Sequence, residues 1–155
     1  MSMDSPSAQL VHRNLPLLFL QARESVFARF RPILHTVGLT EQQWRVVRAL
    51  LDHGPLEPRQ IGDICRLSSP SLAGILARMA DLGLVLRERL ERDQRRVMVS
   101  VTPQGKALAA KLAPTIEATY RALEEEMGVE FIAQLYATLD AVISRLGEAR
   151  AGDEG

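Results

Sequence analysis

The sequence contains one cysteine, Cys65, among its 155 residues, so no disulfide can form within the chain. A chain without disulfides fits a reducing compartment, and we expect the protein to be cytoplasmic. Long apolar runs are also missing. The run at 15–20 is far shorter than the roughly 20 residues that cross a bilayer, and no cleavable signal peptide is evident. We therefore expect no membrane partner and one compact unit over 1–155.

Residues that would form a catalytic or metal site are scarce. The three histidines, His12, His35 and His53, are scattered, and none has a cysteine or carboxylate at the spacing of metal ligands. The sequence has neither a Gly-x-Ser-x-Gly motif nor a phosphate loop of the Gly-x-x-x-x-Gly-Lys type. These absences predict a protein that is not an enzyme and that holds no metal or cofactor.

Net charge is missing too, because 19 basic residues balance 19 acidic ones, but the charges are unevenly distributed. Between Arg59 and Arg96 there are eight arginines and five acids, a local charge of +3. From Glu117 to the C-terminus there are nine acids and three arginines, a local charge of −6. Because neutralising phosphates supplies much of the affinity for nucleic acid, the middle of the chain is predicted to face phosphates.

Residues 84–105 are the most informative segment that is present. Their apolar residues alternate along two arms, which is typical of a half-buried pair of strands. These residues are Leu84, Leu86, Val97, Val99 and Val101. The predicted connection carries four arginines, Arg89, Arg92, Arg95 and Arg96. Such a hairpin is suited to touch a polyanion, although a charged turn that only keeps the surface polar is the alternative.

Two short helices are predicted before this hairpin. Residues 56–66 carry one apolar stripe, and the sequence 67–70 interrupts it. Ser69 followed by Pro70 predicts the start of the second helix, with the serine as N-cap and the proline in the first helical position. Gly83 is suited to end it in a left-handed conformation. Helix, turn, helix and basic hairpin form the winged helix-turn-helix plan, which we assign to 40–101.

Further helices are predicted on both sides of this domain. One runs from Leu10 to about His35, with Pro16 in an early turn and Pro32 in the last turn, and two more cover 102–127 and 131–146. Between them, Thr40 to Gln43 predicts a capping box. The flanking helices carry more apolar surface than one small domain can cover. We therefore predict that 10–38 and 102–148 form a homodimer, whose two DNA half-sites lie about 10 base pairs apart. Packing within one chain is the alternative.

Several short motifs follow one another along the chain: Leu39-Thr-Glu-Gln-Gln-Trp44, Ser69-Pro-Ser71, Leu82-Gly-Leu-Val85, and Asp93-Gln-Arg95 with Val101-Thr-Pro-Gln-Gly105. Through these motifs the chain resembles the multiple antibiotic resistance regulator (MarR) family over about residues 10–148. The last combination is the most specific. Short segments within 21–24, 39–45 and 93–97 also resemble the regulators of homoprotocatechuate degradation. The resemblance implies a mainly α fold with a small β-hairpin, and a dimeric repressor that leaves a pseudo-palindromic operator when a small ligand binds.

The resemblance also implies roles for residues that contact double-stranded DNA. Arg95 would enter the minor groove, Asp93 would orient it, and Arg92 and Arg96 would contact phosphates. In the recognition helix, four small residues would let the backbone approach the groove, and Arg78 would contact phosphate or guanine. The four small residues are Ser69, Pro70, Ser71 and Gly74. An exposed polar helix face without any role in binding is the alternative.

Ligands of this family lie between the dimerisation helices and the winged domain and are commonly aromatic carboxylates. A cation beside an aromatic ring would hold such a ligand, and Arg23 with Trp44 fits that description. Arg13 and His12 are further candidates, on this chain's pocket or the partner's, and a surface ion pair is the alternative for each arginine. The narrower resemblance implies 4-hydroxyphenylacetate or 3,4-dihydroxyphenylacetate as the effector.

Two other functions stay open at this point. A redox-sensing regulator would use a reactive cysteine, but Cys65 lies on an apolar helical stripe, where a buried and inert thiol is expected. A winged domain can also serve protein contacts alone, although the arginines of the hairpin argue against that use.

Overall fold

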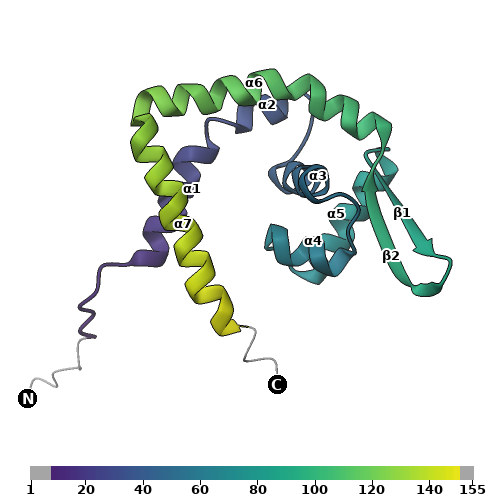
Figure 1. Ribbon diagram of the computed structural model, residues 1–155, viewed down its shortest axis with the longest axis horizontal. Helices are drawn as coiled ribbons and strands as arrows, with labels where there is room; N and C mark the ends of the chain where they lie inside the picture. Colours follow the sequence, from purple (N-terminus) through teal and green to yellow (C-terminus); the bar gives the residue numbers. More distant parts are fainter. Residues whose placement is uncertain (1–7, 151–155) are drawn as a thin grey trace, which may run out of the picture.

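The computed structural model describes residues 8–150, and it describes side-chain burial as far as residue 147. The elements are α1 (Leu15–Phe27), α2 (Arg31–His35), α3 (Glu41–His53), α4 (Pro58–Cys65), α5 (Ser69–Asp81), β1 (Val85–Leu90), β2 (Asp93–Val101), α6 (Pro103–Met127) and α7 (Val129–Arg150). They form an arch, in which α6 bridges the winged part on one side and α1 with α7 on the other (Figure 1). The predicted fold class, mainly α with a small hairpin, is confirmed. None of the helices described is long and apolar enough to cross a membrane.

The single helix predicted from Leu10 to His35 is wrong, because the structure forms two helices there. Asn14 starts α1, since its side chain accepts a hydrogen bond from the Leu17 amide at 3.2 Å. Pro32 lies in the first turn of α2 and not in the last turn of a long helix. Proline has no amide hydrogen and clashes with the carbonyl four residues earlier, so it fits only where a helix begins.

The capping box predicted before α3 is confirmed. The Gln43 amide donates to the Thr40 hydroxyl, and the Thr40 amide donates to the Gln43 side chain, both at 3.1 Å. Helix α3 buries its apolar face in the core of the winged part, which lies between α3, α4, α5 and the base of the hairpin. The fully buried side chains of this core include Val46, Val47, Ile61, Met79 and Val99. The same core continues between α2 and α6 through Leu34, Leu112 and Ile116.

The start of the recognition helix differs by one residue from the prediction. Ser68 is the N-cap of α5, so Ser69 and Pro70 are its first and second residues. Both positions tolerate proline, because the first amides of a helix have no partner within it. The helix ends as predicted, with Gly83 at a φ of +75°. The recognition helix therefore begins with three exposed residues, Ser69, Pro70 and Ser71.

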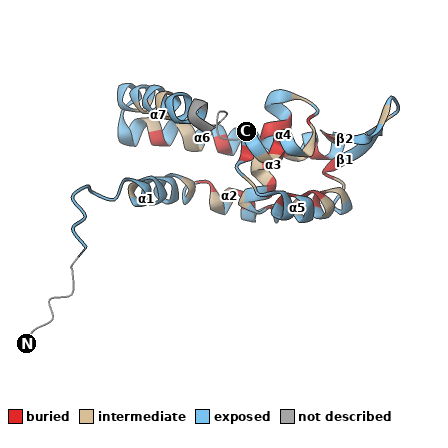
Figure 2. Ribbon diagram, turned by 90° about the horizontal axis from the view of Figure 1, so that it is seen from below, coloured by how far each residue is buried: buried red, intermediate tan, exposed pale blue. Residues whose placement is uncertain are grey.

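The hairpin has a shorter connection than the sequence predicted. Its strands are antiparallel and pair from Val85 with Val101 to Leu90 with Asp93, so the turn consists of Glu91 and Arg92. Arg89, Arg95 and Arg96 consequently lie on the strands. The predicted burial of Leu86 is also wrong, because this side chain is 48 % exposed. The hairpin projects away from the domain, so only its base packs against the core (Figures 1 and 2).

The base of the hairpin is fixed by the segment that opens α6. The Thr102 hydroxyl accepts a hydrogen bond from the Gly105 amide at 3.0 Å and donates one to the Gly83 carbonyl at 2.6 Å. A Cβ added at Gly105 would lie 2.5 Å from the carbonyl oxygen of Leu84, so only glycine fits there. The Thr-Pro-Gln-Gly motif thus joins the wing rigidly to α6. Further along, Pro114 lies inside α6.

Helices α1 and α7 leave their apolar side chains uncovered within one chain. None of the residues whose burial is described in these two helices is buried (Figure 2). The exposed large side chains include Leu15, Leu17, Phe19, Leu20, Phe131, Tyr136, Ile143 and Leu146. A second surface is therefore needed to remove them from water, and the alternative of packing wholly within one chain is not what the structure shows.

Candidate nucleic-acid interface and effector cavity

The exposed face of α5 carries the residues predicted to read DNA. Ser71, Gly74 and Arg78 are all exposed, while Leu72 and Met79 on the opposite face are buried. The Ser68 hydroxyl donates to the Ser71 hydroxyl at 3.0 Å, which fixes the first turn. A Cβ added at Gly74 would meet nothing within 4 Å, so nothing in the protein itself requires glycine there. This face is therefore exposed and accessible to a large ligand.

The wing presents Arg95 to solvent. Its side chain is 96 % exposed, and its Nε lies 3.7 Å from a carboxylate oxygen of Asp93. The same oxygen accepts a hydrogen bond from the Arg95 amide at 3.1 Å, which fixes the backbone of the strand. Asp93 therefore contacts both ends of Arg95, and Arg92 lies next to it in the turn. The guanidinium is aimed outward with few contacts of its own.

Arg96 differs from the other wing arginines because it already has a partner. Its guanidinium forms an ion pair with Glu57, the residue that caps α4. The Glu57 amide donates to the Gln60 side chain at 2.9 Å, so this carboxylate belongs to a well-ordered helix start. A phosphate would have to compete with Glu57 for Arg96. In the free protein the pair fastens β2 to the helix-turn-helix.

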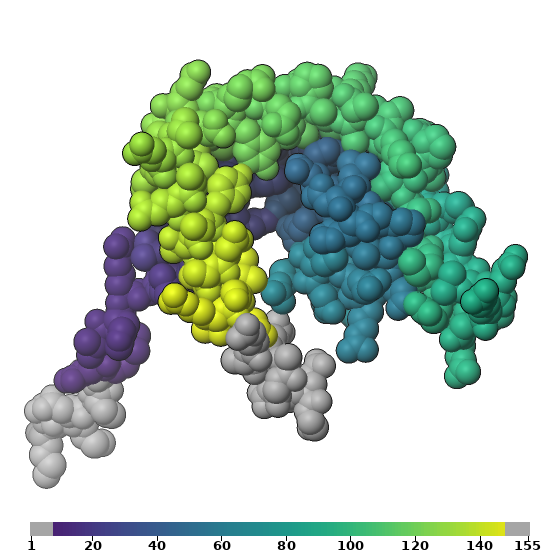
Figure 3. Space-filling view, in the orientation of Figure 1, coloured from purple at the N-terminus to yellow at the C-terminus, as the bar shows by residue number. Residues whose placement is uncertain are grey.

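A cavity of about 590 Å³ lies under the arch, between α1, α3, α6 and α7. Figure 3 shows the hollow between α7 and the winged part. Its volume is that of pockets that take drug-sized molecules. Its lining is almost wholly apolar and includes Leu18, Phe19, Phe27, Phe30, Ile116, Leu135 and Leu139. The cavity also contains both residues predicted as its clamp, Arg23 and Trp44, and one phenol, Tyr120.

A second cavity of about 370 Å³ shares Arg23, Trp44 and Tyr120 with the first and adds Arg48. The Arg48 Nε donates to both carboxylate oxygens of Asp52 at 3.2 Å. Burial opposes the charge of Arg48, but Asp52 outweighs it, so the pKa of Arg48 is raised. Burial raises the pKa of Tyr120, and the charge of Arg48 only partly offsets this. Tyr120 therefore keeps its proton at neutral pH and can donate a hydrogen bond.

Two predicted effector residues do not reach this cavity. His12 and Arg13 precede α1, are exposed, and line neither cavity of their own chain. Conversely, Tyr120 and Arg48 line these cavities but were not predicted from the sequence. Arg48 is four residues after Trp44 on the same helix, and this spacing was the signal that could have found it. Tyr120 comes from the middle of α6, and no local pattern marks it.

Cys65 is buried, with 2 % of its surface exposed. Burial raises the pKa of its thiol, and the nearby Arg45 opposes this only in part. The thiolate is the reactive form, so a buried cysteine with a raised pKa reacts slowly.

Comparison with known proteins identifies the family. Residues 37–96 match the MarR family. The homoprotocatechuate degradative operon repressor of Escherichia coli is 39 % identical over 143 residues, which are 92 % of this chain and 96 % of that protein. The chain belongs to the MarR family. The family, the winged-helix fold and the function as a ligand-responsive, DNA-binding regulator, all predicted from the sequence, are thereby confirmed.

Two solved structures of similar proteins agree with this assignment. The transcriptional regulator PA4135 superposes with a TM-score of 0.83 at 38 % identity, covering 86 % of this MarR-family chain and 98 % of PA4135. NadR in complex with 4-hydroxyphenylacetate gives a TM-score of 0.77 at 34 % identity, covering 88 % of this chain and 96 % of NadR. The first of these proteins is a transcriptional regulator, and the second holds an aromatic acid.

Proposed function

We propose that this protein is a homodimeric repressor that binds a pseudo-palindromic operator and leaves it when an aromatic acid enters the cavity under the arch. Residues 40–101 would contact DNA, and 10–38 with 102–148 would form the dimer. The observation that carries the proposal is the position of the cavity between these two parts. We also propose that the protein acts in the cytoplasm, where operator DNA is found, and that it is a regulator without enzymatic activity.

The uncovered faces of α1 and α7 support the homodimer. They expose large apolar side chains that one chain leaves in water, and a twofold dimer would bury the same patch on both subunits. Ile143 is 59 % exposed on α7. Ile143→Lys should therefore convert dimers into monomers in sedimentation velocity, while a monomeric wild-type protein would contradict the proposal.

Contact with DNA would come from the exposed face of α5 and from the wing. Ser69, Pro70, Ser71 and Gly74 would lie against the major groove, with Arg78 beside them. The wing would contribute Arg92, Arg95 and Arg96, and Asp93 would hold Arg95 in place. Arg96 would exchange Glu57 for a phosphate on binding.

The cavity fits a small aromatic acid such as 4-hydroxyphenylacetate or 3,4-dihydroxyphenylacetate. An aromatic ring would pack against Trp44 in the apolar lining, the carboxylate would pair with Arg23, and Tyr120 would donate a hydrogen bond. We assign the carboxylate to Arg23 and not to Arg48, because Arg23 lines both cavities and Arg48 lines only the smaller one. His12 and Arg13 are proposed to serve the cavity of the partner subunit.

Calorimetry with 4-hydroxyphenylacetate tests the site directly. Arg23→Gln should weaken binding of the acid at least tenfold, while Arg48→Gln serves as the matched control on the other side of Trp44. If Arg48→Gln alone abolishes binding, the carboxylate is held there and the assignment of Arg23 is wrong. A wild-type protein that binds neither acid and no DNA would contradict the whole proposal. The alternative of a redox sensor is not favoured, because Cys65 is buried.

A further inference from the structure

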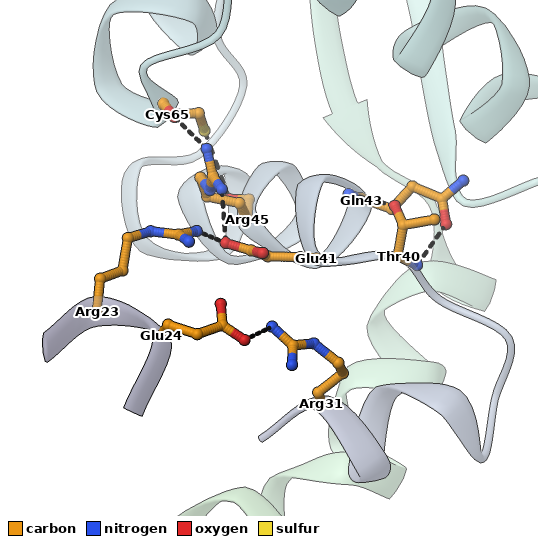
Figure 4. A network of polar contacts seen from close by, with 8 residues as sticks. All are labelled: Arg23, Glu24, Arg31, Thr40, Glu41, Gln43, Arg45 and Cys65. Carbon is orange, nitrogen blue, oxygen red and sulfur yellow. Dashed lines mark hydrogen bonds and ion pairs between the residues drawn. The ribbon is translucent and has the colours of Figure 1, made fainter. Parts of the chain in front are cut away.

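One carboxylate oxygen joins α1 to α3. Oε1 of Glu41, the first residue of α3, accepts a hydrogen bond from Nη2 of Arg45 at 2.8 Å and forms an ion pair with Nη2 of Arg23 (Figure 4). A carboxylate is favoured at a helix N-terminus, which holds Glu41 in place. Glu41 thus has two cations, one from the effector cavity and one from its own helix.

Arg45, the second of these cations, also contacts the end of α4, just before the recognition helix. Nη1 of Arg45 donates a hydrogen bond to the carbonyl oxygen of Cys65 at 2.9 Å, and the Cys65 thiol donates one to the carbonyl oxygen of Arg45 at 3.5 Å. Cys65 is the last residue of α4. The next residue, Arg66, has a φ of +56°, and no other described residue except glycine has a positive φ. Two residues later Ser68 caps α5. Arg45 therefore holds the turn of the helix-turn-helix motif at the point where its backbone is most constrained.

The charges involved are only partly screened by water. The side chains of Glu41 and Arg45 are 21 % and 33 % exposed, so their interaction is stronger than that of a pair on the open surface. Arg23 is 47 % exposed and reachable from the cavity. A ligand carboxylate that pairs with Arg23 removes one of the two cations from Glu41. Arg45 must then satisfy Glu41 alone while it also holds the Cys65 carbonyl.

We propose that Glu41 and Arg45 form a relay through which the state of Arg23 sets the affinity of the recognition helix for DNA. This inference rests on the proposed function, and it specifies the path by which the effector acts. Glu41 and Arg45 are positioning residues, because neither is proposed to touch DNA. The relay also makes Glu41 a competitor of the effector, since both seek the same guanidinium.

A neighbouring ion pair provides a matched control. Arg31 of α2 donates to the Glu24 carboxylate of α1 at 2.7 Å, with exposures similar to those of Arg23. It lies beside the relay in Figure 4, but in the described part of the chain no hydrogen bond or ion pair joins Arg31 or Glu24 to α3 or α4. Removing the Glu24–Arg31 pair also takes one ion pair from α1, but it leaves the contacts from Arg23 through Glu41 and Arg45 to Cys65 intact.

The first test needs no effector. Operator affinity is measured by fluorescence anisotropy on a labelled duplex that the wild-type protein selects from a random-sequence pool. Arg23→Gln imitates the effector and should weaken binding about fivefold or more, the usual lower limit of an allosteric coupling. In a Glu41→Gln background the same change should have no further effect. Additive effects of the two changes would overturn the relay, as would an equal loss with Glu24→Gln.

The second test adds 4-hydroxyphenylacetate. Glu41→Gln should bind the acid more tightly than the wild type, because the competing carboxylate is gone. The acid should nevertheless reduce the operator affinity of this variant less than that of the wild type. A merely structural role of Glu41 predicts weaker binding of the acid, and that result overturns the relay. Arg45→Lys keeps the charge but lacks the second donor arm, so it should still fold, as judged by circular dichroism, and lose the coupling. A wild-type protein that selects no duplex overturns the proposed function, and the relay with it.

Discussion

Replacement of Gly74 by alanine should separate folding from DNA binding, because it is expected to change them in opposite directions. Gly74 is exposed in the middle of α5, and an added Cβ would meet nothing within 4 Å. Glycine inside a helix is less stable than alanine by roughly 0.5–1 kcal/mol. For a chain of this size each kcal/mol raises the melting temperature by about 2–4 °C. Gly74→Ala should therefore melt about 1–4 °C higher than the wild type.

The same methyl group should weaken DNA binding. If the first turns of α5 lie against the groove, the methyl separates the helix backbone from the bases and weakens the neighbouring phosphate contacts. We expect a loss of about tenfold in affinity, equivalent to about 1.4 kcal/mol. Circular dichroism gives the melting temperature, and fluorescence anisotropy on the selected duplex gives the affinity. An unchanged affinity beside a raised melting temperature would refute a close approach at Gly74.

Two other glycines serve as controls for this experiment. Gly147 in α7 also has open space around an added Cβ, so Gly147→Ala should leave DNA affinity unchanged and should not lower the melting temperature. Gly105→Ala should be strongly destabilising, because its Cβ would lie 2.5 Å from a backbone oxygen of Leu84. The three variants together show whether a loss of DNA affinity comes from the surface or from a damaged fold.

Arg95→Ala should weaken operator binding and reduce the steepness of log affinity against log salt concentration by about 1. Its melting temperature should not change, because the Arg95 side chain is 96 % exposed. An unchanged affinity in a salt titration would contradict the wing assignment. Cys65 should react slowly with iodoacetamide in the folded protein at pH 7.5 and rapidly in denaturant, and fast labelling of the folded state would restore the redox alternative. The hydrogen bond from Arg29 lowers the pKa of Glu126 below its ordinary value of 4.5. The pair therefore stabilises the fold above that pH and less as the pH falls, so Glu126→Gln should lower the melting temperature at pH 6 more than at pH 3.

Local patterns in the sequence predicted much of the winged part. Thr40 to Gln43 forms a capping box through contacts three residues apart, and Gly83 ends α5 because its own φ requires glycine. Such features depend on neighbours in the chain, so the sequence reveals them. The break after Phe27 was missed because Pro32 was assigned to the end of a helix, although proline equally fits a helix start.

Contacts between distant segments were beyond the sequence. Arg23 and Trp44 could be predicted as cavity residues from the family resemblance, but Tyr120 enters the cavity only because α6 folds back over α3. The ion pair of Arg96 with Glu57 joins residues 39 positions apart, and a charge count cannot show it. The sequence therefore predicts which residues are charged and exposed, while the partner of each charge depends on the tertiary fold.

Pro114 gives α6 a point at which the helix bends easily. It removes the amide that would bond to the carbonyl of Ala110, so bending the long helix costs least near its midpoint. From Pro103 to Pro114 the helix extends about 17 Å at 1.5 Å per residue, and a tilt of about 5° moves its far end by roughly 1.5 Å. Since Thr102 and Gly105 fasten that end to the wing, α6 works as a lever arm. In the proposed dimer, a tilt of this size where the two subunits meet would change the distance between their wings by ångströms.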